Sequence, residues 1–240
     1  MGGSELNGKL YQLGDAAVIV QLGNSINLET HQRVKALVGY LEQHPFTGMI
    51  EYVPAFTTVT IFYDPVYFYG KNQFSPYQQV CTIVEGILSK LEAGSDEGGR
   101  LIEIPVCYGG SFGSDLDFVA ESNGLTTEEV IRYHTSGDYL VYMIGFAPGF
   151  PYIGGMSERI ATPRRSSPRL AIPAGSVGIA GKQTGVYPIE TPGGWQLIGR
   201  TPLALFRPNA SSPSLLQAGD RIRFSSITEE EYLEMKEGQE

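Results

Sequence analysis

The first 93 residues carry two stripes of apolar side chains at helical spacing, separated by short apolar runs of the kind that form strands. One helix is predicted to begin near Asn27 and to end at Pro45, and a second to begin at Ser75-Pro76, where a capping residue precedes a proline. The order strand, helix, strand, strand, helix predicts a ferredoxin-like α+β domain over residues 1–93. Its strands are expected at residues 16–22, 49–53 and 57–63.

A short polar stretch rich in glycine, residues 92–100, is predicted to link two domains. Beyond it, glycine and proline recur every few residues and separate short apolar runs, which indicates many short strands joined by turns. This pattern predicts a closed β-barrel or sandwich over residues 100–228, followed by an acidic tail at 229–240 that forms a solvated helix. The barrel strands are expected at residues 101–108, 139–144, 170–172, 177–180, 195–198 and 221–224.

Residues 115–134 show helical spacing interrupted by Gly124, with Ser114 expected to cap the first helix. Thr126 and Glu129 have the spacing of a capping box at the start of the second. Two helices joined by a short turn also describe a DNA-binding motif, but here acidic residues would occupy the end of the recognition helix that enters the groove. We therefore expect a helical hairpin packed on the barrel and no binding of nucleic acid.

The net charge of −9 supports this exclusion, because an acidic protein repels nucleic acid on average. The charge is unevenly distributed: residues 100–228 carry eleven cationic side chains, ten of them arginine, against ten anionic ones. Arginine binds carboxylates and phosphates through two parallel hydrogen bonds. The second domain is therefore the better candidate for binding an anionic ligand.

The two cysteines, Cys81 and Cys107, and the three histidines show no spacing typical of a zinc site or a disulfide framework. We expect a cytoplasmic protein that folds without a metal. Residues 1–10 lack the apolar core of a signal peptide. Residues 139–156 hold no charge, but prolines and glycines interrupt them, so we expect buried strands and loops rather than a membrane span.

Two glycine-rich segments resemble catalytic motifs without fulfilling them. Residues 109–113 match the G-x-S-x-G pattern of a nucleophile elbow, but only one histidine, His134, follows to complete a triad, so a plain glycine turn is favoured. Within residues 175–184, five residues separate Gly175 from Gly181 and glutamine follows the lysine, whereas a P-loop needs four residues and a serine or threonine. Any ATP is therefore expected to bind mainly to another polypeptide.

The glycine- and proline-rich loops between residues 134 and 202 hold cationic, amide and aromatic side chains. Glycine lets the backbone approach a ligand closely, arginine binds anions, and glutamine hydrogen bonds to a carbonyl or an amide. A structural interpretation is equally open, in which the arginines satisfy loop carbonyls and cover aromatic rings. The candidate ligand-binding side chains are Arg164, Arg165, Arg169, Gln183 and Arg200.

Four segments of the second domain strongly resemble the KipI / allophanate hydrolase subunit 1 family. They are residues 145–155, GFAPGFPYIGG; 163–169, PRRSSPR; 173–188, PAGSVGIAGKQTGVYP; and 192–203, PGGWQLIGRTPL. Gly14-Asp15, Val53-Pro54 and Tyr63-Asp64-Pro65 resemble the N-terminal half of the same family, so the resemblance extends over nearly the whole chain. It implies an N-terminal α+β domain followed by a cyclophilin-like β-barrel.

The same resemblance implies a subunit of an ATP-dependent 5-oxoprolinase, a hydrolase that opens the lactam of 5-oxo-L-proline to L-glutamate together with partner subunits A and C. We expect the chain to be inactive alone and ATP to bind mainly to a partner subunit; the related carboxyl-transfer chemistry of urea-processing enzymes stays open. The implied roles are carboxylate or phosphate contacts for Arg164, Arg165, Arg169 and Arg200, amide orientation for Gln183, and either proton transfer or a structural role for His134.

A second function that the family implies belongs to a different class, namely inhibition of a sporulation sensor histidine kinase without chemistry of its own. A groove lined by Phe146, Pro148 and Phe150 is then expected to accept a proline-containing segment of the kinase. Both functions can belong to one protein, so the family resemblance leaves the choice between them open.

Overall fold

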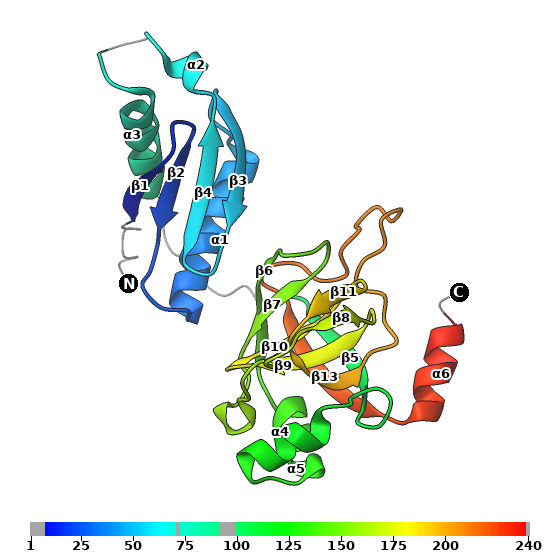
Figure 1. The fold of residues 1–240 in the computed structure, drawn as a ribbon. Helices are drawn as coiled ribbons and strands as arrows, with labels where there is room; N and C mark the ends of the chain where they lie inside the picture. The colour runs from blue at the N-terminus through cyan, green and yellow to red at the C-terminus, as the bar shows by residue number, and fades with distance from the viewer. Residues whose placement is uncertain (1–7, 71–72, 92–98, 239–240) are drawn as a thin grey trace. The chain divides into compact units, whose positions relative to one another are not determined.

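A computed structural model describes residues 8–70, 73–91 and 99–238 (Figure 1). The chain divides into two compact units, residues 1–98 and 99–240. Each unit has its own cluster of buried apolar side chains. The division falls within the predicted linker, of which residues 92–98 lie outside the described parts of the chain.

The first unit is an antiparallel sheet with strand order β1-β2-β4-β3, and α1 and α3 pack against it (Figure 1). The predicted strands and helices are present, together with an edge strand, β1, and a short helix, α2, that were not predicted. The apolar pattern misses β1 because four of its five side chains are exposed. The ferredoxin-like description of this unit stays a prediction. The elements are β1 (Lys9–Leu13), β2 (Ala17–Gln21), α1 (Leu28–Gln43), β3 (Met49–Pro54), β4 (Thr58–Tyr63), α2 (Pro65–Phe68) and α3 (Pro76–Leu88).

Local sequence signals begin the two long helices of this unit. The side chain of Asn27 accepts a hydrogen bond from the N–H of Thr30 at the start of α1, and Ser75 and Gln78 form a reciprocal capping box at the start of α3. The apolar stripes of both helices then pack on the same side of β2 and β4. The core side chains include Val18, Val20, Val34, Leu37, Val59, Ile61, Val80 and Val84.

The second unit is a closed barrel with strand order β10-β7-β6-β13-β5-β12-β9. β5 and β13 are parallel and stay in register from Leu101 opposite Arg221 to Cys107 opposite Ile227. The other neighbouring strands are antiparallel, and apolar side chains fill the interior. The strands are β5 (Leu101–Tyr108), β6 (Tyr139–Ile144), β7 (Pro151–Gly154), β9 (Ser176–Ala180), β10 (Gln183–Val186), β12 (Gln196–Arg200) and β13 (Arg221–Ile227).

The predicted helical hairpin is present as α4 (Leu116–Asn123) and α5 (Thr127–Thr135), which pack on the barrel (Figure 1). Gly124 adopts the left-handed conformation that ends α4, where glycine avoids the strain of a side chain. Thr126 and Glu129 form the predicted capping box at the start of α5. Sequence signals within one turn of the chain therefore shape this hairpin.

Two predictions for this unit are wrong. The strand predicted at residues 170–172 does not belong to the barrel, because it lies in β8 (Arg169–Ile172), which pairs with β11 (Thr191–Gly193) in a separate two-stranded sheet. Ser114 does not cap α4, because Asp115 occupies the N-cap position. The carboxylate of Asp115 makes no capping hydrogen bond and is engaged by more distant partners.

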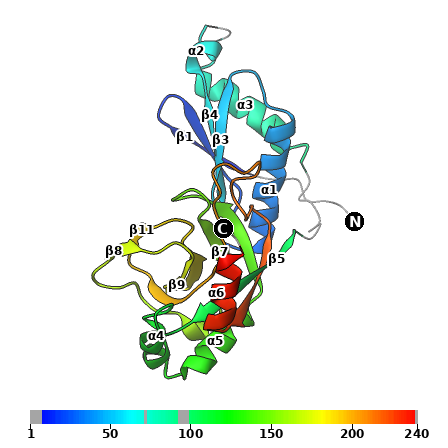
Figure 2. The same cartoon turned by 90° about the vertical axis from the view of Figure 1, so that its right-hand side faces the viewer.

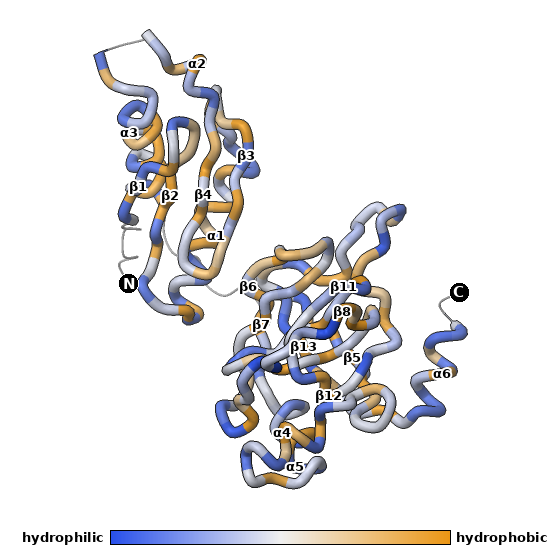
Figure 3. The backbone as a smooth tube through the Cα atoms, in the orientation of Figure 1, coloured by the Kyte–Doolittle hydropathy of each residue, from blue (hydrophilic) through white to orange (hydrophobic). Residues whose placement is uncertain are grey.

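The acidic end of the chain forms α6 (Glu229–Glu237), which lies against β5 (Figure 2). Most of this helix is hydrophilic (Figure 3). Its one buried side chain, Tyr232, packs against the tilted ring of Phe112 at a centroid distance of 4.7 Å and anchors the helix. None of the helices in the described parts of the chain has the length and apolar character needed to span a bilayer.

Candidate functional site

A pocket of about 380 Å³ opens on the barrel unit where the glycine- and proline-rich loops meet. Its lining is mainly aromatic or small, with one cationic and one amide side chain, a composition typical of a site for a small ligand. Trp195, the only tryptophan in the sequence, forms part of the wall. The lining residues are Phe146, Phe150, Tyr152, Arg164, Pro168, Gln183, Tyr187, Pro192, Gly193, Gly194 and Trp195.

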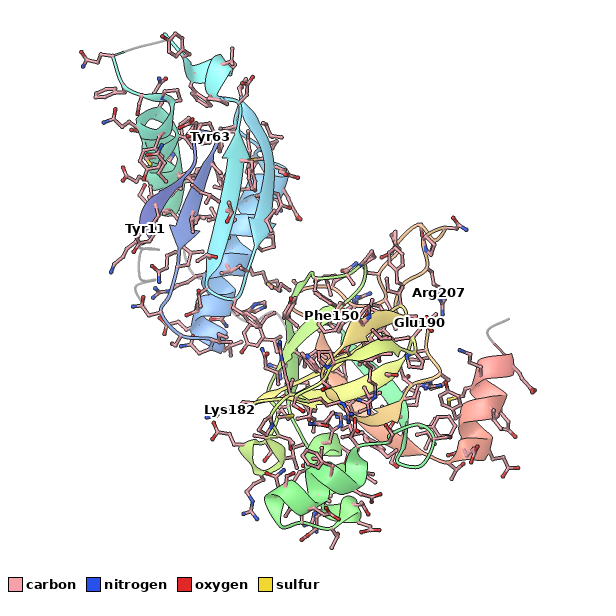
Figure 4. All side chains as sticks on the ribbon, viewed as in Figure 1. Tyr11, Tyr63, Phe150, Lys182, Glu190 and Arg207 are labelled. Carbon is pink, nitrogen blue, oxygen red and sulfur yellow. The ribbon has the colours of Figure 1, made fainter. Side chains whose placement is uncertain are left out.

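Phe150 is the centre of the aromatic wall, within the barrel unit (Figure 4). Its ring is buried and meets four neighbouring rings at steep angles, with centroid distances from 5.4 to 5.9 Å. Edge-to-face pairs of this kind favour one relative orientation of the rings, so the wall is preformed. The four neighbours are Phe146, Tyr152, Tyr187 and Trp195.

Phe146 forms the exposed lip of the pocket. Its φ angle is 70°, the only positive φ outside glycine among the described residues, and 70% of its surface is exposed. A bulky side chain in this conformation is strained, and such strain clusters at functional sites. Of the three residues predicted to line a partner groove, Phe146 and Phe150 line this pocket, whereas Pro148 is exposed and does not line it.

Arg164 and Gln183 supply the charged and amide groups of the pocket. Gln183 is half-buried at the start of β10, and Arg164 is exposed in the loop before β8, where it makes no ion pair with any described residue. The pKa of Tyr187 is raised, chiefly by burial, and the positive charges of Arg164 and Arg169 partly oppose that rise. An unpaired guanidinium beside an aromatic wall is suited to bind a carboxylate.

Asp115 joins the two segments that frame this pocket. Its Oδ1 accepts hydrogen bonds from Arg165 Nη1 at 3.0 Å and from Arg169 Nη2 at 2.7 Å, and its Oδ2 accepts one from the backbone N–H of Leu197 at 2.7 Å. The same loops are further linked by a hydrogen bond from the Arg165 N–H to the Gly194 carbonyl at 2.7 Å. The buried carboxylate therefore holds the loop that carries Arg164 against the strand that follows Trp195.

The structure thus separates the four arginines predicted as ligand contacts. Arg165 and Arg169 neutralise Asp115, and only Arg164 lines the pocket. Arg200 lies elsewhere: it is paired with Ser176 at one end of β9, whereas Gln183 is paired with Ala180 at the other. These two ends are about 14 Å apart at the usual rise of a strand. Arg200 therefore does not line the pocket that contains Gln183.

His134 lies in the interior of the barrel unit with none of its surface exposed. Its Nδ1 lies 2.7 Å from the Tyr108 hydroxyl and its Nε2 lies 2.8 Å from Thr184 Oγ1. Because the Thr184 hydroxyl donates to the Gly178 carbonyl, it accepts from Nε2–H, and Nδ1 accepts from Tyr108. Burial lowers the pKa of His134 to about 3. These contacts favour the structural interpretation of His134 over proton transfer.

Two further predictions concern metal and phosphate binding. The described residues contain no group of three or more His, Cys, Asp or Glu side chains able to hold a metal ion. Residues 175–184 form a turn and the antiparallel pair β9–β10 rather than a strand followed by a helix. This geometry does not provide the helix N-terminus on which a P-loop binds phosphate.

The sequence profile of the carboxyltransferase domain, subdomain C and D, matches residues 9–216. The chain belongs to this family. Over 232 residues it is 54% identical to the B subunit of 5-oxoprolinase from Bacillus subtilis (strain 168), in a match that covers 95% of this chain and 97% of that protein. It is 42% identical over 216 residues to the B subunit of 5-oxoprolinase from Escherichia coli O157:H7, covering 90% of this chain and 94% of the relative.

A solved structure, that of a conserved uncharacterized protein from Pyrococcus horikoshii, is 44% identical and covers 93% of this chain and 100% of its own, with a TM-score of 0.55. These matches confirm the family resemblance found in the sequence motifs. The carboxyltransferase subdomain C and D match spans parts of both units and includes the pocket, Asp115 and Arg200, whereas α6 lies beyond it. The site described here is therefore part of the shared family region.

Proposed function

We propose that this chain is the B subunit of an ATP-dependent 5-oxoprolinase, a complex that opens 5-oxo-L-proline to L-glutamate. The observation that carries the proposal is the 54% identity to the 5-oxoprolinase B subunit of Bacillus subtilis over 95% of this chain. The pocket supports it, because its aromatic wall, single guanidinium and single amide match a small ring that bears one carboxylate and one lactam.

Within this proposal each part of the pocket has a task. Arg164 binds the substrate carboxylate, because Arg165 and Arg169 are already paired with Asp115. Gln183 orients the lactam, since its side-chain amide both donates and accepts hydrogen bonds. The five-membered ring rests against the wall around Phe150 and Trp195, which excludes water from the bound substrate.

ATP supplies the activation that the lactam lacks. An unstrained lactam is a poor electrophile, and phosphorylation of its carbonyl oxygen makes the carbon easier for water to attack. In the proposal, partner subunits A and C hold ATP and complete the catalytic site in the cytoplasm, because residues 175–184 of this chain do not form a P-loop. The chain alone binds and orients substrate and is inactive by itself.

A reconstitution experiment tests this function. The chain is co-expressed with candidate subunits A and C, and the release of L-glutamate from 5-oxo-L-proline is measured with and without ATP. We expect release only when this chain, both partners and ATP are all present. Full ATP-dependent release from a complex that lacks this chain would contradict the proposal, as would turnover by the isolated chain.

Inhibition of a sensor histidine kinase stays the second candidate function. The exposed, strained Phe146 at the pocket lip supports it, because an exposed aromatic side chain held in one place suits the capture of a partner segment. Kinase autophosphorylation is expected to fall as the chain is added, and Phe146→Ala is expected to weaken this effect. Autophosphorylation unaffected by an excess of the chain would contradict the second function.

A further inference from the structure

Two glycines lie against Trp195 in the wall of the aromatic pocket, the cavity of about 380 Å³ described above. Gly178 of β9 and Gly185 of β10 are directly opposite each other in the antiparallel pair of these strands. Val177 and Ile179, on either side of Gly178 in the sequence, fill the barrel interior. Because side chains alternate along a strand, Gly178 and its partner Gly185 face the outer surface instead. The two glycines therefore leave bare backbone on the outside of the barrel.

The side chain of Trp195 lies across both glycines. A Cβ at Gly178 would lie 3.1 Å from Trp195 Cβ, and a Cβ at Gly185 would lie 3.0 Å from Trp195 Cζ3 and 3.3 Å from its Cη2. These distances are shorter than an ordinary contact between carbon atoms, which is about 3.5–4.0 Å. A methyl group at either position would therefore push against the Trp195 side chain.

The backbone itself does not require glycine at these two positions. Neither Gly178 nor Gly185 is among the glycines with a positive φ. Both lie within the regular antiparallel pairing of β9 and β10. A residue with a side chain can adopt such a backbone conformation without strain. The missing side chains thus serve the packing of Trp195 rather than a turn.

Two buried rings hold Trp195 in place beside the glycines. Its ring meets those of Phe150 and Tyr187 at 89° and 79°, with centroid distances of 5.9 and 6.3 Å. A Cβ at Gly185 would also lie 3.3 Å from Phe150 Cζ, so this ring does not yield space easily. The open space next to Trp195 is the pocket that it lines. We therefore expect a side chain at Gly185 to displace the indole toward the pocket.

We propose that Gly178 and Gly185 are positioning residues for the substrate, because they set how far the Trp195 ring reaches into the aromatic pocket and thereby how large a ligand the pocket admits. The inference rests on the proposed function for the identity of the ligand, 5-oxo-L-proline, whereas the position of the indole is a property of this chain alone. A methyl group at Gly185 narrows the pocket and weakens the binding of the five-membered ring.

A purely structural role for these glycines makes a different prediction. Aromatic rings that cover glycines also stabilise sheets, and in that case Gly185→Ala lowers Tm without affecting the substrate. Gly199→Ala is the matched control for destabilisation of the same barrel. A Cβ at Gly199 would lie 2.6 Å from Val106 Cγ1 and 2.8 Å from the Cys107 carbonyl oxygen, and none of these three residues lines the pocket.

Trp195 fluorescence of the full chain measures the displacement directly, since the chain has no other tryptophan. In Gly185→Ala, and more strongly in Gly185→Val, we expect emission at longer wavelengths and easier quenching by acrylamide, because the indole moves toward the open pocket. Native fluorescence is expected in Gly199→Ala and in Gly86→Ala, where an added Cβ meets nothing within 4 Å. Native emission and quenching in both Gly185 variants would overturn the proposal.

The reconstituted complex measures the consequence for the substrate. We expect Gly185→Ala to raise the KM for 5-oxo-L-proline by about fivefold or more and to change kcat less, because overpacking narrows the binding site. In the Trp195→Phe background the smaller ring leaves room for the methyl group, so Gly185→Ala is expected to raise KM by less than about twofold. An equal rise in both backgrounds would overturn the proposal, as would an equal rise in Gly199→Ala.

The two measurements separate this inference from the proposed function. If the complex with the native chain releases no L-glutamate, the 5-oxoprolinase function fails, whereas the fluorescence change in the Gly185 variants still supports the placement of Trp195 by the glycines. If the native complex is active but Gly185→Ala has native fluorescence and a native KM, the positioning role fails alone.

Discussion

At the scale of single residues, His134 shows how burial decides between two chemical roles. Its imidazole lies in the barrel interior, and both of its nitrogens are used in hydrogen bonds with Tyr108 and Thr184. Burial disfavours the charged form and lowers the pKa of His134 to about 3. A neutral, fully enclosed imidazole stabilises the fold and has no contact with the aromatic pocket.

This low pKa predicts acid sensitivity. The folded state holds His134 neutral, so its stabilising effect is complete above the unfolded pKa of about 6.5 and is lost as the pH falls from there toward 3. We expect the free energy of unfolding to fall by up to about 1.4 kcal/mol per pH unit in this window from this group. Denaturant unfolding at several pH values measures this change in the free energy of unfolding.

The variant His134→Gln is expected to be less stable at pH 7 and to lose this part of the pH dependence. His44→Gln is the matched control, because His44 is exposed and caps the end of α1. It is expected to keep the native pH dependence. If the free energy of unfolding depended on pH equally in His134→Gln and in the native chain, the structural role of His134 would be contradicted.

At the scale of elements, the barrel unit depends on one carboxylate that joins a loop, a helix start and a strand. Asp115 lies at the N-cap of α4, accepts hydrogen bonds from Arg165 and Arg169, and also accepts one from the backbone of Leu197 at β12. The pocket loop is therefore fixed by a contact that comes from outside the pocket. Changes at Asp115 are expected to alter the pocket without touching a ligand.

Asp115→Asn is expected to destabilise the chain by about 1–3 kcal/mol, because it weakens charged hydrogen bonds of a buried group. It is also expected to make Trp195 fluorescence easier to quench with iodide, since the pocket loop is less firmly held. Glu129→Gln is the control, because glutamine can keep the capping box with Thr126 and only the surface ion pair with Arg132, 3.6 Å long, is lost. Such pairs contribute about 1 kcal/mol or less. Quenching unchanged in Asp115→Asn would contradict the role given to Asp115.

The sequence predicts what depends on neighbours along the chain. The helix starts at Asn27, Ser75 and Thr126 follow from capping residues within one turn, and the helical hairpin follows from Gly124. Asp115 carries no such signal, because its arginine partners lie 50 and 54 residues away. For the same reason the sequence could not show that Arg164 alone of the four arginines lines the pocket. It also could not show that β8 pairs with β11 outside the barrel.

At the scale of the whole molecule, the chain consists of two units with separate apolar cores. One core lies between the sheet and helices of residues 1–98, and the other fills the barrel of residues 99–240. Each core contains only residues of its own unit. Neither unit needs side chains of the other to bury its apolar surface, so each is expected to fold by itself.

A fragment of residues 99–240 is therefore expected to unfold cooperatively and to keep the near-ultraviolet circular dichroism of its packed aromatic side chains. Trp195 and its neighbours around Phe150 contribute to this signal, because their rings are packed against one another. The fragment of residues 1–98 serves as the companion sample. A barrel fragment without a cooperative transition would contradict the independence of the two cores.

The central claim is that Arg164 binds the carboxylate of 5-oxo-L-proline in the aromatic pocket. The most direct measurement is the KM for 5-oxo-L-proline in the reconstituted complex that carries Arg164→Ala. We expect KM to rise by about tenfold or more, because one charge-assisted contact is lost, with Arg132→Ala as the unaffected control. A KM for Arg164→Ala equal to that of the native complex would contradict the account.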